Sequence, residues 1–466
     1  MSIEMTEVLQ SVADTCEGFV ELRYVKKTTR QIAVESGRVE QANVKRRNGV
    51  GVRVLEDGSW GFSSTGSSDA ASIKRAVDRA RDAARVSADR KKDKAPPLGK
   101  TVLARGHFAN DAAAAVAAIP LERKVELALE TEAEARGKSH LIKSATCVYN
   151  EIDEEKALVT TDGAAANFRL VRPEFRIQSV AERDGVMSSA NESVGVTGNW
   201  DCLFERRSRE ALVESSARFA VDLLDAQLPQ GGRHTVILAP SIVGLLVHEA
   251  IGHTVEADFV LSGSVAQGKI GQRVASDLVT LCDSGFSEFH PGAGGTLPVD
   301  DEGVPTQKTT IIRDGILESY LHNRESAARF GVEPTGNARA WDYSDQPLIR
   351  MRNTYLCPGE QTLEEIIAST EDGYLLDGPR NGQADATGEF MFAVQNAVRI
   401  KNGKLAELVK GVTISGVAFE VMQTVDAVSK EFRWDLGSGY CGKGQPAKVD
   451  AGGPYIRCRA LLGGAQ

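Results

Sequence analysis

Two histidines and one glutamate occur within six consecutive residues, His248-Glu249-Ala250-Ile251-Gly252-His253, and these residue types can bind a metal ion and activate water beside it. In the common zinc-peptidase motif the two histidines are four residues apart, so that they share one face of a helix. Here they are five residues apart, and a regular helix of about 3.6 residues per turn would leave the two rings roughly 140° out of register. We therefore predict an irregular helix, widened by a π-bulge at Gly252, that returns both rings to one side.

The third ligand of this predicted metal centre has to come from elsewhere in the chain, because catalytic zinc sites usually hold three protein ligands and leave one position open. Cys441 is the leading candidate. It lies in the glycine-rich stretch 437–445, where the backbone can approach a metal closely and Lys443 can favour the thiolate. Spacing alone is a weak argument, because a lone cysteine is more often a small core residue. The competing ligands are His322, Asp300, Asp301 and Glu302.

Other polar residues are candidates for supporting roles. Glu256 and Asp258 follow the second histidine, and we predict that they hydrogen-bond to the imidazoles or supply an extra ligand, although a solvated helix end explains them equally well. Polar loops further along supply candidate substrate or oxyanion contacts, because a bound amide backbone needs paired donors and acceptors. These candidates are Thr335, Asn337, Arg352 and Asn353, and ordinary turn formation is an equal alternative for them.

The pattern along the chain indicates an α+β fold in two parts. Residues 1–228 predict an α/β domain with a mixed sheet and long helices, and a composition break at 228–232 ends it. Residues 233–466 predict a β-rich domain that carries the irregular metal-binding helix. Strand character is found at 19–24, 31–35 and 50–55, and helical periodicity at 69–87, 121–136 and 203–224. In the second domain a short helix is expected at 362–370 and a hairpin at Asn402-Gly403.

Composition is that of an ordinary globular protein. The chain has 466 residues, of which 42% are hydrophobic and 26% charged, and is long enough for two domains. A formal net charge of −9 argues against a nucleic-acid-binding protein, which needs clustered excess Lys and Arg. No apolar run approaches the roughly 20 residues of a membrane helix, the N-terminus has no signal-peptide pattern, and the seven cysteines contain no Cys-x-x-Cys pair. We therefore expect a cytoplasmic protein that binds neither nucleic acid nor membranes.

Several short motifs occur together in one order over most of the chain. They are Gly49-Val50-Gly51-Val52-Arg53-Val54-Leu55, the metal motif continued by Thr254-Val255-Glu256-Ala257-Asp258, Asp300-Asp301-Glu302-Gly303-Val304-Pro305, Thr335-Gly336-Asn337, Arg352-Asn353-Thr354-Tyr355 and Cys441-Gly442-Lys443. With these motifs the sequence resembles the TldD/PmbA metallopeptidases, and among them the TldD-type subunit that keeps the metal motif. It departs from that pattern at Ala338-Arg339-Ala340, where the TldD pattern has glycine and a pair of arginines, and this departure bears on local substrate contacts.

This resemblance implies one Zn²⁺ per chain, held by His248, His253 and Cys441, with Glu249 as the catalytic acid and base. It also implies a dimer that encloses the site, formed with a PmbA/TldE-type partner or as a homodimer, and unfolded or small peptides as substrates, including peptide precursors. The prediction is a zinc-dependent peptidase in which Glu249 assists the attack of water activated at the metal. Two alternatives stay open: a non-catalytic peptide-binding or scaffold subunit of a two-chain protease, and a zinc amidase acting on a modified small molecule. Similar N and S ligands also suit other divalent metals.

Overall fold

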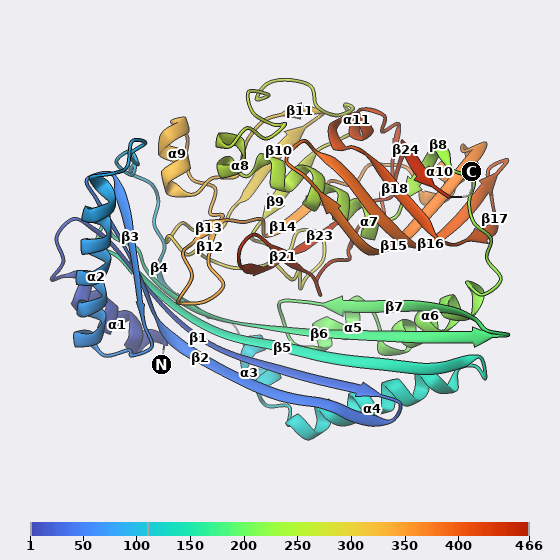
Figure 1. Ribbon diagram of the computed structural model, residues 1–466, viewed down its shortest axis with the longest axis horizontal. Helices are drawn as coiled ribbons and strands as arrows, with labels where there is room; N and C mark the ends of the chain where they lie inside the picture. The colour runs from blue at the N-terminus through green and yellow to red at the C-terminus, as the bar shows by residue number, and fades with distance from the viewer. Residues whose placement is uncertain (1, 110, 465–466) are drawn as a thin grey trace.

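One seven-stranded sheet organises the first part of the chain in the computed structural model, which describes residues 2–109 and 111–464 (Figure 1). Its strands lie in the order β3-β2-β1-β5-β6, and β4 and β7 both pair with β6. These pairings are antiparallel except that of β4 with β6, so the sheet is mixed, as predicted. The strands are β1 (Phe19–Glu35), β2 (Arg38–Glu56), β3 (Ser59–Thr65), β4 (Arg105–Phe108), β5 (Ile142–Thr160), β6 (Ala165–Arg183) and β7 (Val186–Gly195).

Helix α2 (Ala70–Ala88) shows why the sequence forms these elements. Asp69 caps its first turn, because the carboxylate accepts a hydrogen bond from the backbone N–H of Ser72. Small and apolar residues at helical spacing bury one face of this helix, and a Cβ added at Gly61 of β3 would overlap the carbonyl oxygen of Ala80. The other helices of this part are α1 (Ser2–Ala13), α3 (Asp111–Ala117), α4 (Leu121–Gly137), α5 (Trp200–Arg206) and α6 (Arg209–Asp222).

Two predicted elements of this part differ from the structure. The strands predicted at 19–24 and 31–35 form one continuous strand, β1, because the residues between them also pair with β2 and β5. The helix predicted at 203–224 is divided into α5 and α6. The division occurs because Ser208 starts a new helix, its side chain accepting a hydrogen bond from the backbone N–H of Ala211.

Two larger sheets build the second part. One has the order β11-β10-β9-β14-β23-β20, and the other has the order β15-β8-β24-β18-β16-β17. Pairing of β15 with β16 closes five strands of the second sheet into a ring. The strands are β8 (Gly232–Leu238), β9 (Leu281–Ser284), β10 (Lys308–Arg313), β11 (Ile316–Leu317), β12 (Ala338–Arg339), β13 (Leu348–Ile349), β14 (Asn353–Leu356), β15 (Asp372–Ala384), β16 (Glu389–Lys401), β17 (Lys404–Val409), β18 (Val412–Val417), β19 (Ala427–Val428), β20 (Arg433–Trp434), β21 (Tyr440–Gly442), β22 (Pro446–Lys448), β23 (Asp450–Gly453) and β24 (Ile456–Gly463).

Both local predictions for this second part are confirmed. A short helix, α10 (Leu363–Ala368), lies inside the range 362–370, and Thr362 begins it with a capping box. Asn402-Gly403 joins β16 to β17, and both residues have positive φ, 49° and 70°, as a two-residue hairpin turn of this type requires. The remaining α-helices of this part, apart from those of the buried helix below, are α9 (Arg324–Phe330) and α11 (Ala418–Gln423).

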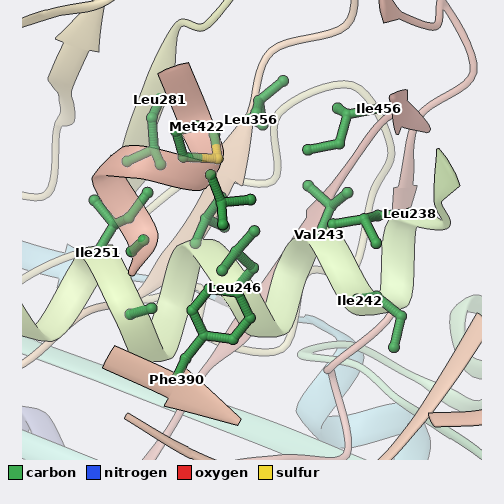
Figure 2. Close-up of a cluster of buried hydrophobic side chains, with 14 of the residues drawn as sticks. Leu238, Ile242, Val243, Leu246, Ile251, Leu281, Leu356, Phe390, Met422 and Ile456 are labelled. Atoms are coloured by element: carbon green, nitrogen blue, oxygen red, sulfur yellow. The ribbon is translucent and has the colours of Figure 1, made fainter. Parts of the chain in front are cut away.

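A buried helix runs through the main core of the second part (Figure 2). It begins as α7 (Pro240–Leu245) and continues as the π-helix η1 (Leu246–Gly252), the 3₁₀ turn η2 (His253–Val255) and the short helix α8 (Ala257–Leu261). Each fully buried Val, Leu or Ile stabilises the fold by roughly 1.5–3 kcal/mol, so the core holds this segment in place. Its apolar residues pack with side chains from both sheets and from α11, and this cluster includes Leu238, Ile242, Val243, Leu246, Ile251, Leu281, Leu356, Phe390, Met422 and Ile456.

Buried ion pairs join the first sheet to the second part. Lys156 Nζ of β5 lies 2.8 Å from Asp301 Oδ1, and Lys448 Nζ of β22 lies 2.5 Å from Glu174 Oε1 of β6. All four side chains are buried, so each charge is compensated mainly by its partner. The hairpin β21–β22 is therefore held against the first sheet by one of these pairs.

The α+β class predicted from the sequence is confirmed by this arrangement of helices and sheets. The first sheet uses strands up to residue 195, and the other sheets use strands from residue 232 onward. The division into domains 1–228 and 233–466 stays a prediction. In the described part of the chain, no helix is both long enough and apolar enough to cross a membrane.

Candidate metal centre

The irregular helix predicted from the spacing of the two histidines is present. The backbone N–H of His253 donates to the carbonyl oxygen of His248, which is the five-residue bond of a π-helix. This wider turn brings the rings to the same side, with centroids 5.3 Å apart and planes at 79°. Gly252 has no room for a side chain, because an added Cβ would overlap Met351 Sδ. The glycine therefore lets the π-helical turn pack directly on Met351.

The hairpin β21–β22 brings Cys441 to these rings. Its Sγ lies 3.1 Å from His253 Nε2, and within the described residues the ligand atoms of His248, His253 and Cys441 all lie within 4.8 Å of one another. Arg350 holds the hairpin by donating to the carbonyl oxygens of Cys441, at 2.6 Å, and Gln445, at 2.7 Å. The chain thus places a thiol from one end of the second part against imidazoles from the other.

Charges within the group favour the thiolate. Burial raises the pKa of the Cys441 thiol, but the charges of the nearby His248 and His253 and the contact of His253 with the sulfur outweigh burial and lower this pKa to about 4. Burial lowers the pKa of His253, but Glu256 and Cys441 raise it to about 10. The thiolate is the form of cysteine that binds metals, and a metal that replaces the imidazole protons would release them.

The group fits a zinc ion by its unsatisfied atoms and by its chemistry. Neither ring nitrogen of His248 has a hydrogen-bond partner in the described residues, although the side chain is only 2% exposed. Buried polar atoms are nearly always paired, so this histidine is explained by a ligand that it binds. Two imidazoles and one thiolate are a ligand set that suits zinc and leaves a fourth position open. Glu249 is 29% exposed in its side chain and has its Oε2 atom 3.8 Å from His253 Nε2, which places a carboxylate beside the group.

A carboxylate and a lysine support one imidazole. The buried side chain of Glu256 accepts from His253 Nδ1 at 3.0 Å, which leaves Nε2 facing Cys441. Such a contact fixes the orientation and the basicity of a metal-binding imidazole. Lys443 Nζ lies 2.9 Å from Glu256 Oε2 and 2.7 Å from Asp258 Oδ2. Asp258 therefore acts on the group through Lys443, and within the described residues its carboxylate bonds to Lys443 and to the backbone N–H of Phe259 and not to an imidazole.

The four residues predicted to contact substrate are buried and bound to protein groups. Arg352 Nε and Asn337 Nδ2 both donate to Asp283 Oδ2, at 2.9 Å each. Thr335 Oγ1 accepts from the backbone N–H of His322 at 2.7 Å, and Asn353 Oδ1 accepts from that of Gly295 at 2.8 Å. The structure does not bring these side chains into the His/His/Cys group, and their contact with substrate stays a prediction. The four residues predicted to contact substrate are Thr335, Asn337, Arg352 and Asn353.

The competing ligands have other partners. His322 Nδ1 lies 3.0 Å from Ser326 Oγ, and burial lowers its pKa to about 4. Asp300 accepts backbone N–H groups of its own turn, Asp301 pairs with Lys156, and Glu302 pairs with Arg53. These acidic residues build a turn at the boundary between the two parts of the chain. No sequence pattern indicated Arg350 or Met351, whose roles depend on contacts between distant segments.

Comparison with known proteins bears on the class of protein. The model of the PmbA/TldA metallopeptidase C-terminal domain matches residues 231–462, and models of domain 1 and of the central domain match residues 20–84 and 115–224. The chain is 33% identical to a metalloprotease of Methanothermobacter thermautotrophicus over 98% of both chains. It is 37% identical to a zinc metalloprotease TldD homolog of Saccharolobus solfataricus over 52% of this chain and 54% of that one.

Solved structures show the same fold. A Thermotoga maritima protein, described as a proposed modulator of a DNA gyrase, has a TM-score of 0.81 at 21% identity over 99% of this chain and 100% of that one. TldE from Thermococcus kodakarensis has a TM-score of 0.79 at 20% identity over 98% and 99%. The fold is thus that of TldD/TldE-type proteins, and the named relatives are metalloproteases. The chain belongs to the PmbA/TldD metallopeptidase family, as its motifs predicted.

Proposed function

We propose that this protein is a zinc-dependent peptidase that hydrolyses unfolded or small peptides, including peptide precursors. The observation that carries the proposal is the convergence of His248, His253 and Cys441, with Glu249 beside them, on one buried side of a π-helix. A relative named as a zinc metalloprotease supports zinc as the metal. The proposal includes one zinc ion in each chain. Glu249 is the catalytic acid and base in this proposal, and Glu256 positions His253.

The chemistry divides between the metal and the chain. When bound, zinc supplies Lewis-acid polarisation of the scissile carbonyl and of water. The Glu249 carboxylate takes a proton from the attacking water and delivers it to the leaving amine nitrogen, a task that requires an accessible carboxylate. Its side-chain exposure of 29%, beside imidazoles and a thiol that are largely buried, meets this requirement.

We further propose that the working unit is a dimer, formed either with a TldE-type partner or by two copies of this chain. The fold likeness to a protein named TldE supports this proposal.

All seven cysteines are free, which suits a reducing compartment such as the cytoplasm.

The test is mass spectrometry of a pool of unstructured peptides incubated with the zinc-loaded chain, alone and with a TldE-type partner. Fragments are expected with the wild type and with Glu420→Gln, an exposed carboxylate on α11, and none with Glu249→Gln. Fragments from Glu249→Gln at the wild-type rate would overturn the catalytic assignment. Intact peptides in every mixture would favour the scaffold subunit, and release of acyl groups from small amides without peptide cleavage would favour the amidase.

A further inference from the structure

A cavity of about 640 Å³ lies between the two parts of the chain. Its walls come from β7 and α5 in the first part, and from β15, β16 and residues 432–439 in the second. Its lining includes none of the ligands of the metal group or Glu249. A volume of this size is typical of small-molecule sites, and the side chains of Phe219, Phe432 and Trp434 give it an apolar wall.

Three of the four carboxylates that line this cavity share two guanidinium groups as ion-pair partners. Arg207 pairs with Glu192, and Arg433 Nε lies 3.3 Å from Asp435 Oδ2 while its Nη2 lies 3.9 Å from Asp377 Oδ2. Three carboxylates therefore face two guanidinium groups. The other charged groups of the lining are Arg206, whose Nη1 lies 2.8 Å from Asp450 Oδ2, and the exposed Arg176 and Glu205, so the lining as a whole holds four guanidinium groups and four carboxylates.

Burial is the main cause of a raised pKa at two of these carboxyl groups. It raises the pKa of Asp435 above its ordinary value, with a further rise from Asp377, against the lowering effects of Arg433, Arg206 and Arg207. The pKa of Glu192 is raised in the same way, by burial and by Asp377 against the effect of Arg207. A cation bound among these carboxylates would relieve their mutual repulsion.

Three polar atoms of the lining residues have no hydrogen-bond partner within the described residues. Two are acceptors, Asn396 Oδ1 and Asp435 Oδ2, the second of which lies in the ion pair with Arg433 Nε, and one is a donor, Arg206 Nη2. Asn396 is only 6% exposed. Buried polar atoms are rarely left unpaired. The unused acceptors match the N–H groups of an ammonium ion, and the unused donor matches a carbonyl oxygen.

We propose that this cavity binds the amino-terminal residue of a short peptide. The ammonium group is held by Asp435 and Asn396, the adjoining carbonyl oxygen accepts from Arg206, and the side chain packs on Phe432 and Trp434, where an aromatic ring can also attract the cation. A free amino acid carries the same ammonium and carbonyl groups, and the experiment below separates the two sources. Binding here requires neither the metal nor cleavage, so it does not rest on the proposed function.

The test is calorimetric titration of the full chain carrying Glu249→Gln, so that cleavage does not interfere. The probe is phenylalanyl-alanyl-alanine amide, and its N-acetylated form is the matched neutral control. We expect the acetylated probe to bind at least about 10-fold more weakly, a loss of about 1.4 kcal/mol. Equal binding of both probes, or no binding of either, would overturn the proposal. Free phenylalanine bound as tightly as the tripeptide amide would keep the amine site but overturn the peptide assignment.

Variants locate the binding. Asp435→Asn is expected to weaken the amine probe at least about 10-fold, and Asp377→Asn, whose side chain is 43% exposed, provides a second variant if the first does not fold. Asp426→Asn removes an exposed carboxylate that pairs with Arg457 and does not line the cavity, so it should bind as the parent chain does. Unchanged binding in a folded Asp435→Asn or Asp377→Asn chain would place the peptide elsewhere and refute the inference.

Discussion

Lys443 Nζ lies 2.9 Å from Glu256 Oε2, the same oxygen that lies 3.0 Å from His253 Nδ1. Lys443 follows Cys441 by two residues on the hairpin, so a single carboxylate links the segment that carries the thiol to the imidazole that the thiol contacts. The ring of Phe259, 4.4 Å from Nζ, covers the lysine. This contact fixes the distance between two of the three candidate ligands.

We expect Lys443→Met to weaken zinc binding about 10–100-fold, because partners that orient metal ligands have effects of this size. The loss arises from a hairpin that is no longer tied to Glu256 and from a His253 ring that is less firmly held. Competition with a chelator of known zinc affinity measures it. Lys430→Met, at an exposed position outside the hairpin, is the control and should bind zinc as the wild type does. Equal zinc affinity of Lys443→Met and the wild type would show that the hairpin is positioned without this lysine.

Cys441→Ser is expected to reduce bound zinc from one ion per chain to a small fraction, because a hydroxyl does not ionise at neutral pH as this thiol does. Cys458→Ser is a matched control, since Cys458 is also buried but belongs to β24, and burial raises the pKa of its thiol to about 12. Metal analysis after dialysis against a weak chelator distinguishes the two variants. A Cys441→Ser chain that retains one zinc ion would assign the third ligand to another residue.

Glu249→Gln is expected to lower kcat about 10²–10⁴-fold, the usual contribution of a general base, and to leave zinc content unchanged. The amide keeps the size of the side chain but cannot accept the proton from water. Peptide turnover and metal content measured on the same sample separate the loss of a base from the loss of the metal. If both fall together, Glu249 is needed to hold the metal and its role as a base is not supported.

Gly252→Ala is expected to destabilise the fold by about 1–3 kcal/mol, because the added methyl group overlaps Met351 Sδ and the core cannot make room without strain. Denaturant unfolding measures this change. Gly137→Ala is the control, since a Cβ there meets no atom within 4 Å among the described residues and this glycine ends helix α4. The control should be neutral or slightly stabilising. Equal stability of both variants would mean that the π-helical turn tolerates a side chain.

The sequence predicted the π-helix because two rings five residues apart can meet on one side of a helix only if a turn is widened. The glycine-rich stretch around Cys441 made it the leading third ligand, but spacing alone left His322 and the acidic residues open. The thiol lies 188 residues from His253 in the chain, and the contact between them is made by the tertiary fold. The motif resemblance implied Cys441 among these candidates. No sequence pattern predicts the hydrogen bonds of Arg350, because it donates to backbone carbonyl oxygens that are distant in the chain, and any residue type can supply such an oxygen.

Local signals were reliable where the deciding contact is local, as in the capping box of Thr362 and the hairpin turn at Asn402-Gly403. The same signals missed the end of a helix where a single residue decides it, as at Ser208, which divides the helix predicted at 203–224 into two. The polar residues Asn337 and Arg352 illustrate a further limit. Their sequence is that of a polar loop, but both side chains are buried and converge on Asp283, and only the structure could show this.

The buried pair Lys156–Asp301, between the first sheet and the second part, predicts a pH-dependent stability. Burial raises the pKa of Asp301, but Lys156 and Arg23 outweigh burial, so this pKa lies below its ordinary value. A carboxyl group whose pKa is lower in the folded than in the unfolded state stabilises the fold at pH values above its unfolded pKa of about 4. This stabilisation is lost as the pH falls through the folded pKa. The pair therefore contributes fully at neutral pH and progressively less in acid.

Lys156→Met leaves the buried Asp301 carboxylate with weaker compensation, so we expect the free energy of unfolding to fall by about 3–5 kcal/mol near neutral pH. The loss should be smaller near pH 4, roughly the unfolded pKa of the carboxyl, because there the variant's Asp301 takes up a proton and no longer needs a counter-ion. Urea unfolding at the two pH values measures the difference. Lys143→Met removes a lysine that is 52% exposed and 3.7 Å from Glu182, and it should change stability by less than about 0.5 kcal/mol at both. A loss for Lys156→Met that does not depend on pH would mean that the lysine stabilises the interface by packing and not by its charge.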